Sequence, residues 1–180
     1  MAVLKRRPKS SNLTDFAVGS QTVSPDMLIS QAKKAGISTT PLDVERLVFS
    51  LGIRLNSVPL DDEISGHLAL TEQGWAITVN SLHHPKRQRF TVAHELGHYM
   101  LHRRKCQEFT DKKLFRGVDQ NPMETEANTY AADLLMPADH FKDFITITSN
   151  KIDAIASYFG VSALAVRVRA KTLGFKGHGL

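Results

Sequence analysis

The stretch Thr-Val-Ala-His-Glu-Leu-Gly-His-Tyr-Met-Leu-His, residues 91–102, decides the fold. It contains the pattern H-E-x-x-H, in which His94 and His98 are four residues apart. On an α-helix, side chains at positions i and i+4 lie on the same face, so both imidazoles can reach one metal ion. Glu95 lies at the edge of that face, where its carboxylate can act as general base toward a water molecule. The pattern predicts the metal helix of a zinc hydrolase.

A simpler interpretation is an amphipathic core helix whose histidines are spaced by four residues by chance. Apolar side chains already provide a packing face along this stretch, so the histidines are not needed for packing. These apolar residues are Phe90, Val92, Ala93, Leu96, Met100 and Leu101. The metal interpretation is therefore favoured, provided that a third ligand occurs elsewhere in the chain.

A third ligand is required because a catalytic zinc takes three protein ligands and keeps one position for water. In metzincins this ligand follows the same helix, which would need Gly at position 101 and His at position 104. The chain has Leu101 and Arg104 instead. The third ligand must therefore come from another element.

A second helix is predicted between Asn121 and Pro137, because Pro122 suits a first helical turn and Pro137 ends the segment. Its buried face is formed by residues at helical spacing: Ala127, Tyr130, Ala131, Leu134 and Leu135. Glu124 and Asn128 line the same side, where a carboxylate needs a specific role. Glu126 points away from that side and is expected to be a solvated acid in the first turn. Glu124 is thus the candidate third ligand.

The motifs Arg87–His102 and Glu124–Pro137 together resemble the ImmA/IrrE family of zinc metallopeptidases. The resemblance implies a zincin-type fold and one Zn²⁺ per chain. Matched residue by residue, it assigns Glu95 as the catalytic base. It also assigns the metal ligands as His94, His98 and Glu124.

The resemblance implies a function as well. Relatives cut or inactivate helix-turn-helix repressors, so we expect a zinc-dependent endopeptidase that acts on such a repressor or on an antitoxin in a phage, mobile-element or stress circuit. Asn128 occupies a position that supports the metal ligands in the family, whereas Tyr130 stands where many relatives have Phe. Some members regulate without shown proteolysis. The alternative is therefore a zinc-stabilised, non-proteolytic regulator or toxin that acts by binding protein or DNA.

Composition places the chain among ordinary globular proteins. It has 180 residues, of which 42% are hydrophobic and 23% charged. We expect a basic flexible tail over residues 1–24 and a single metallopeptidase-like domain over residues 25–180. No apolar run approaches the roughly 18 residues that span a membrane, and no secretory signal is expected. The single cysteine, Cys106, excludes an internal disulfide, so a reducing, cytoplasmic location is expected.

The predicted fold class is α+β, zincin-like. Helices are expected over residues 25–36 and 41–52, ahead of a small, mostly antiparallel sheet that packs against the two ligand-bearing helices. Strands are expected over residues 53–59, 65–70 and 75–80. Trp75 to Asn80 is predicted to be the edge strand that binds an extended substrate backbone. Residues 103–121 are expected to be a long charged loop between the metal-binding helices.

The C-terminal segment, residues 150–173, reads as helix, glycine-centred turn and helix, which resembles a helix-turn-helix. Arg167, Arg169 and Lys171 could contact phosphates there, and the formal net charge is +5. We favour packing around the peptidase core as the role of this pair, with DNA binding as the alternative.

Several other residues are candidates for roles in the chemistry. His83 and His84 are adjacent, so they point in different directions and are expected to be loop residues. His102 is expected to support packing or the metal ligands. Tyr130, His102 or a loop residue could stabilise an oxyanion, and the sequence does not rank them. Cys106 is expected to be an incidental thiol.

Overall fold

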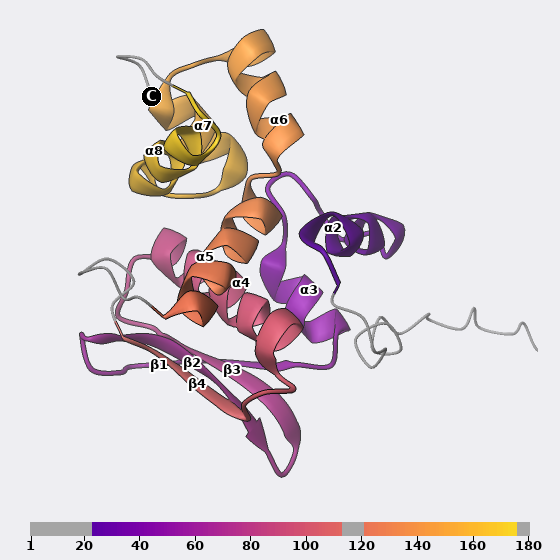
Figure 1. Cartoon of the computed structure of the whole chain (residues 1–180), viewed down its shortest axis with the longest axis vertical. Helices are drawn as coiled ribbons and strands as arrows, with labels where there is room; N and C mark the ends of the chain where they lie inside the picture. The colour runs from indigo at the N-terminus through magenta and orange to yellow at the C-terminus, as the bar shows by residue number, and fades with distance from the viewer. Residues whose placement is uncertain (1–22, 113–120, 176–180) are drawn as a thin grey trace, which may run out of the picture.

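The computed structural model describes residues 23–112 and 121–175 of the chain (Figure 1). Its helices and strands follow the order predicted for an α+β fold. They are α2 (Pro25–Lys34), α3 (Val44–Ser50), β1 (Arg54–Val58), β2 (Ile64–Thr71), β3 (Gly74–Asn80), α4 (Pro85–His102), β4 (Glu108–Lys112), α5 (Pro122–Leu135), α6 (Ala138–Asp143), the π-helical turn η1 (Phe144–Thr148), α7 (Ile152–Phe159) and α8 (Ala163–Thr172).

The four strands form one mixed sheet in the order β1-β3-β2-β4. β2 pairs antiparallel with both β3 and β4, whereas β1 pairs parallel with β3, so the mostly antiparallel prediction is confirmed. The prediction that Trp75 to Asn80 forms an edge strand is wrong, because β3 lies between β1 and β2. A tight hairpin signal predicts the β2–β3 pair but not the crossover that brings β1 to the other side of β3.

β4 was not predicted, because its segment was assigned to the charged loop over residues 103–121. Only Phe109 is apolar in this strand, so the alternation that identifies a strand is weak. The strand is stabilised by pairing with β2, in which Phe109 lies opposite Leu68, and not by a pattern in its own sequence. Residues 113–120 of the predicted loop lie outside the described residues.

Helix α4 covers one face of the sheet, α5 packs on α4, and α3 packs beside α4 (Figure 1). The sheet contributes Leu68, Ile77 and Val79 to the core, all of them buried. Trp75 at the end of β3 meets Tyr99 of α4 edge-to-face, with ring centroids 5.6 Å apart. The metal helix is therefore fixed along its length between the sheet and α5.

The N-terminal helices begin at side-chain caps. Ser24 caps α2 as predicted, through its side-chain oxygen and the backbone N–H of Met27. α3 starts at Val44 with Asp43 as its cap, three residues later than predicted. Residues 1–22 of the predicted tail lie outside the described residues. Val23 belongs to the core instead, since it is buried and its carbonyl accepts a hydrogen bond from Tyr130.

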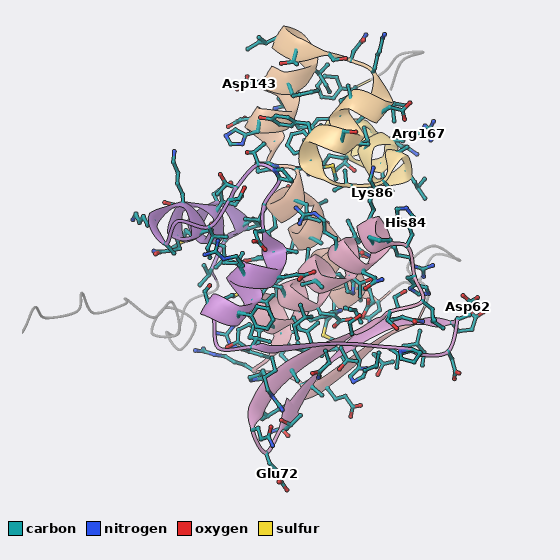
Figure 2. All side chains as sticks on the ribbon, turned by 180° about the vertical axis from the view of Figure 1, so that it is seen from behind. Asp62, Glu72, His84, Lys86, Asp143 and Arg167 are labelled. Carbon is teal, nitrogen blue, oxygen red and sulfur yellow. The ribbon has the colours of Figure 1, made fainter. Side chains whose placement is uncertain are left out.

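The C-terminal elements form a group at the far end of α5 from the sheet, with Asp143 and Arg167 at one end of the molecule and Glu72 at the other (Figures 1 and 2). The predicted helix–turn–helix geometry is present: Gly160 adopts a left-handed conformation with φ 65°, and Ser162 caps α8. No helix in the described ranges is both long and apolar enough to cross a membrane.

Arg169 is not available to nucleic acid. Its side chain is 3% exposed and forms an ion pair with Asp133, 2.6 Å away. Its Nε also donates to the carbonyl of Met136 at 3.0 Å. Of the three basic residues considered for phosphate contacts, Arg167 and Lys171 remain exposed, and the role suggested for Arg169 is wrong.

Candidate metal centre

The centre of α4 is a buried polar helix, which is unusual because histidine and glutamate prefer the surface. His94 and Glu95 are 0% exposed and His98 is 1% exposed. The helix starts at Pro85, whereas residues 83–89 were expected to form a basic turn before it. Pro85 occupies the first turn, and the ring of His84 accepts a hydrogen bond from the backbone N–H of Lys86. Buried polar side chains of this kind require specific partners.

Glu124 of α5 supplies the partner carboxylate for both histidines. Its Oε2 lies 3.2 Å from Nε2 of His94, and its Oε1 lies 3.2 Å from Nε2 of His98. The two Nε2 atoms are 3.0 Å apart. One ligand atom from each residue therefore converges on a common point, all within 4.8 Å of one another.

This arrangement fits a zinc ion. Ligand atoms about 2.0–2.1 Å from a tetrahedral zinc are separated by roughly 3.3 Å, close to the separations in the cluster. Two imidazole nitrogens and one carboxylate oxygen form the donor set of catalytic zinc sites, which leave the fourth position for water. His94, His98 and Glu124 are thus brought together as expected.

The other ring nitrogens of the two histidines also have partners. Nδ1 of His94 lies 3.0 Å from Oδ1 of Asn128, one turn after Glu124 on α5. Nδ1 of His98 lies 3.0 Å from Nδ1 of His102, whose Nε2 lies 2.8 Å from a carboxylate oxygen of Glu126. Asn128 and His102 thus contact the two histidines, as expected of groups that support metal ligands.

These contacts define the tautomers. The carboxylate of Glu126 accepts, so we assign a donor proton to Nε2 of His102, which leaves an acceptor lone pair on its Nδ1. His98 then donates from Nδ1 and presents the lone pair of Nε2 to the cluster. His94 does the same, because Oδ1 of Asn128 accepts from its Nδ1. Each histidine is held in the form that binds a metal.

Glu126 was predicted to be a solvated acid, and its contact with His102 corrects that expectation. Its side chain is 58% exposed, so it faces solvent on one side and His102 on the other. The hydrogen bond with His102 lowers the pKa of Glu126, which keeps the carboxylate ionised as an acceptor.

The pKa values of the ligands also favour metal binding. Burial lowers the pKa of His98, although its contact with Glu124 acts in the opposite direction. Burial alone would raise the pKa of Glu124, but the adjacent imidazoles of His94 and His98 outweigh it and hold the pKa well below its ordinary value. A neutral imidazole and an ionised carboxylate are the forms that bind a metal.

Two glycines allow the close packing that forms this site. A Cβ on Gly97 of α4 would lie 3.0 Å from the carbonyl oxygen of Ala127, so the backbones of α4 and α5 approach closely there. A Cβ on Gly66 of β2 would lie 2.7 Å from both the Thr78 carbonyl oxygen and Cγ2 of Thr91. It would also lie 3.5 Å from Oε1 of Glu95, so the bare β2 backbone lies over that carboxylate.

Phe109 of β4 covers the cluster from the side of the sheet. Its ring stacks on His98 with centroids 4.7 Å apart and an interplanar angle of 17°. Sequence reasoning did not identify Phe109, Gly66 or Gly97, because each acts through a contact distant along the chain. The contact between Glu126 and His102 was also not predicted. The i, i+4 spacing of His98 and His102 did indicate that the row of polar side chains continues past His98.

Other candidates lie away from the cluster. Tyr130 is wrong as an oxyanion candidate, because its hydroxyl is buried and donates to the Val23 carbonyl at 2.7 Å. His83 lies in the loop just before α4, as predicted. It is buried, and its Nε2 lies 4.0 Å from Oδ1 of Asp62. Arg87 supports structure through a 2.8 Å hydrogen bond to Ser65.

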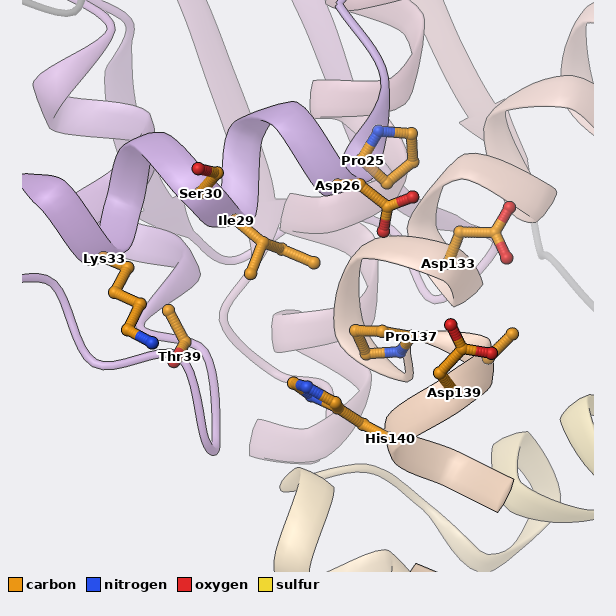
Figure 3. Close-up of a pocket in the computed structure, with 11 residues that line it drawn as sticks. Pro25, Asp26, Ile29, Ser30, Lys33, Thr39, Asp133, Pro137, Asp139 and His140 are labelled. Atoms are coloured by element: carbon orange, nitrogen blue, oxygen red, sulfur yellow. The ribbon is translucent and has the colours of Figure 1, made fainter. Parts of the chain in front are cut away.

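Three cavities of the described residues flank α5, one of them an open hollow of about 490 Å³ beside Leu101, Glu126 and Tyr130. Of the other two, the larger, about 500 Å³, lies between α2 and the α5–α6 junction and includes Asp26, Asp139 and His140 (Figure 3). It contains none of the metal-centre residues. The smaller, about 280 Å³, lies between α4, α5 and α8 and includes Asn128, the partner of His94. The smaller cavity therefore adjoins the candidate centre.

Comparison with known proteins identifies one matched region. The family model described as Peptidase M78, IrrE N-terminal-like domain, matches residues 50–171. The chain is also similar to the "Uncharacterized immunity region protein 2" of Bacillus phage phi105, at 34% identity over 113 residues. That alignment covers 62% of this chain and 70% of the relative. The family match includes all of α4 and α5.

Proposed function

Because the chain belongs to the Peptidase M78 family of IrrE N-terminal-like domains, we propose that it is a zinc-dependent endopeptidase. This membership confirms the resemblance to the ImmA/IrrE family that the motifs Arg87–His102 and Glu124–Pro137 indicated. The observation that carries the zinc assignment is the convergence of His94, His98 and Glu124 beside the buried Glu95. Their donor set, tautomers and spacing all suit zinc.

The proposed mechanism assigns a separate task to each group. When bound, zinc would supply Lewis acidity for activating water and polarising the scissile carbonyl. Glu95 takes the proton of the attacking water and passes it to the amine as the peptide C–N bond breaks. Burial of Glu95 under Gly66 keeps its carboxylate at a defined position for both proton transfers.

The substrate backbone is proposed to pair with β4. This strand is at the end of the sheet order, so one side of its backbone is unpaired by any other described strand. Phe109 of the same strand stacks on His98, which brings the edge close to the candidate centre. An extended peptide added to this edge would cross the metal centre.

The family resemblance and the phage relative support a substrate class. The relative is named for an immunity region, which fits a regulatory protease that acts in a phage or mobile-element circuit. We propose a helix-turn-helix repressor or antitoxin as the substrate. The alternative of a non-proteolytic regulator predicts the same binding partner but no cleavage of it.

A trapping comparison tests the function. Wild type and Glu95→Gln are first shown to hold equal zinc by elemental analysis, and each is then used to capture partners from a lysate of the source cell. We expect one partner that Glu95→Gln retains intact and wild type cuts, with new termini mapped by mass spectrometry. Glu72→Gln at the hairpin tip is the matched control and should cut like wild type (Figure 2).

Two outcomes would contradict the proposal. Cleavage by Glu95→Gln at the wild-type rate would remove Glu95 as the base. A partner that binds both proteins and is cut by neither would identify a binding module, and the search for function would then move to the C-terminal helices.

A further inference from the structure

We propose that the cavity between α4, α5 and α8 is the pocket that selects the substrate, and that it takes a large apolar side chain next to the scissile bond. This inference rests on the proposed function and adds the class of residue that is recognised. The lining residues are Phe90, Asn128, Thr129, Ala132, Ala165, Val168, Arg169 and Thr172.

The position of the pocket places it within reach of the reacting peptide bond. Phe90 precedes the candidate ligand His94 by four residues, about one helical turn or roughly 6 Å along α4. Asn128 lines the pocket and also bonds to the His94 ring. An extended peptide advances about 3.3 Å per residue. A residue within two positions of the scissile bond is therefore within reach of the pocket.

Several polar groups of the lining already have partners in the protein. The hydroxyls of Thr129 and Thr172 donate to backbone carbonyls of their own helices, at Thr125 and Val168. The Arg169 guanidinium is held by Asp133 and the Met136 carbonyl. Oδ1 of Asn128 accepts from His94. A charged or polar side chain would lose its water without gaining an equivalent set of partners.

Apolar side chains supply the remaining surface. Phe90, Ala132 and Ala165 are half-buried, and Val168 is 53% exposed although it is a large hydrophobic residue. A volume of about 280 Å³ is below the roughly 300–1,000 Å³ of sites that enclose a whole small ligand. One Leu, Met or Phe side chain fits this space and would cover the exposed apolar groups.

The test fills the pocket from two different helices. Ala132→Leu on α5 and Ala165→Leu on α8 each add a branched side chain at a half-buried alanine of the lining. Leucine has a helix propensity close to that of alanine, so both variants are expected to fold. Ala138→Leu makes the same change at a half-buried alanine that lines the cavity beside α2. Folding and zinc content are checked by circular dichroism and elemental analysis.

The first measurement is the cleavage profile of a synthetic peptide library by the zinc-loaded full chain. Wild type and Ala138→Leu should prefer Leu, Met or Phe over Ala by roughly tenfold or more in kcat/KM at one position within two residues of the cut. Both pocket-filling variants should lose this preference while still cutting the Ala peptide. Absence of an apolar preference in wild type, or its persistence in both variants, would overturn the inference.

A binding measurement separates this inference from the proposed function. Leucine hydroxamate and glycine hydroxamate share the zinc-chelating group and differ in the side chain. We expect calorimetry to give a roughly tenfold or greater advantage to leucine hydroxamate, which Ala132→Leu removes and Ala138→Leu keeps. If no peptide is cut but this advantage is found, the peptidase function fails and the pocket stands. Equal binding of the two probes to wild type overturns the pocket.

Discussion

At the scale of single residues, the candidate centre depends on side chains that would not touch the metal. Glu126 acts on His98 through His102, and Asn128 acts directly on His94. Each partner determines which ring nitrogen carries the proton, so each should alter the affinity for zinc without altering the ligands themselves.

We expect Glu126→Ala to weaken zinc binding by roughly 10- to 100-fold, the range typical of groups that orient a ligand. Loss of the acceptor lets His102 take either tautomer, so His98 is no longer held with Nε2 free. Competition with a chelator of known affinity measures the effect. Glu126→Gln keeps an acceptor oxygen and should lose less zinc affinity than Glu126→Ala. The control Glu72→Ala also removes an acidic side chain and should keep the wild-type affinity. Equal affinities for Glu126→Ala and wild type would contradict the relay.

A second prediction at this scale concerns Gly66. A Cβ there would lie 2.7 Å from a backbone oxygen and from Cγ2 of Thr91, and the backbone oxygen belongs to the centre of the sheet. We expect Gly66→Ala to lower the free energy of unfolding by about 1–3 kcal/mol, the usual cost of overpacking. Urea denaturation measures this, and adding Thr91→Ala should recover part of the loss. An unchanged stability would show that β2 and α4 can separate freely.

The convergence of the candidate ligands could be predicted because their arrangement is local to each helix. Helical spacing places His94 above His98, and the face shared with Ala127 and Ala131 makes Glu124 unusual. The contacts of Glu126, Phe109 and Gly66 could not be predicted in the same way. Each depends on how two separate elements are placed, which no spacing within one element specifies.

At the scale of elements, the close approach of α4 and α5 determines whether Glu124 can reach the histidines. Gly97 allows it, since its missing Cβ would meet the backbone of Ala127 and the Cβ of Tyr130 at 3.0–3.3 Å. Small residues at helix crossings reduce the interaxial distance in this way. Gly97 was part of the motif stretch, but only the structure shows which helix it faces.

We expect Gly97→Val to separate the two helices, lowering both the free energy of unfolding by about 1–3 kcal/mol and the affinity for zinc. Valine is chosen because alanine would gain roughly 1 kcal/mol of helix propensity, which would obscure the clash. Thermal unfolding with and without zinc measures both effects. Ser157→Val on the exposed face of α7 is the control for valine propensity. A Gly97→Val protein that keeps wild-type zinc affinity would contradict this account.

The elements themselves were only partly predictable. The helices with caps and long periodic faces were predicted within a few residues of their bounds, because caps and periodicity are properties of short segments. β4 was missed, and β3 was placed at the edge of the sheet. Strand order depends on crossovers between distant segments, and a strand with one apolar residue gives no alternation to read.

At the scale of the whole molecule, Arg169 links the C-terminal helices to the metal-binding region. It lies on α8, and both of its partners lie on or just after α5, the helix that carries Glu124. α6, η1, α7 and α8 therefore pack as part of the fold around the centre. This supports the packing role that the sequence favoured for the C-terminal pair.

The last prediction follows from that link. Arg169→Ala removes a side chain that is only 3% exposed and leaves a cavity in its place. The Met136 carbonyl loses its side-chain donor, whereas Asp133, which is 40% exposed, can be hydrated by solvent. We expect the free energy of unfolding to fall by about 2–4 kcal/mol. In a chain of this size that lowers Tm by roughly 4–16 °C. Arg167→Ala, on the exposed face of the same helix, should change stability by no more than about 0.5 kcal/mol.

If the two variants unfold at the same temperature, α8 is not part of the cooperative unit. The substrate pocket that α8 shares with α4 and α5 would then be mobile, and the selectivity expected of it would be lost.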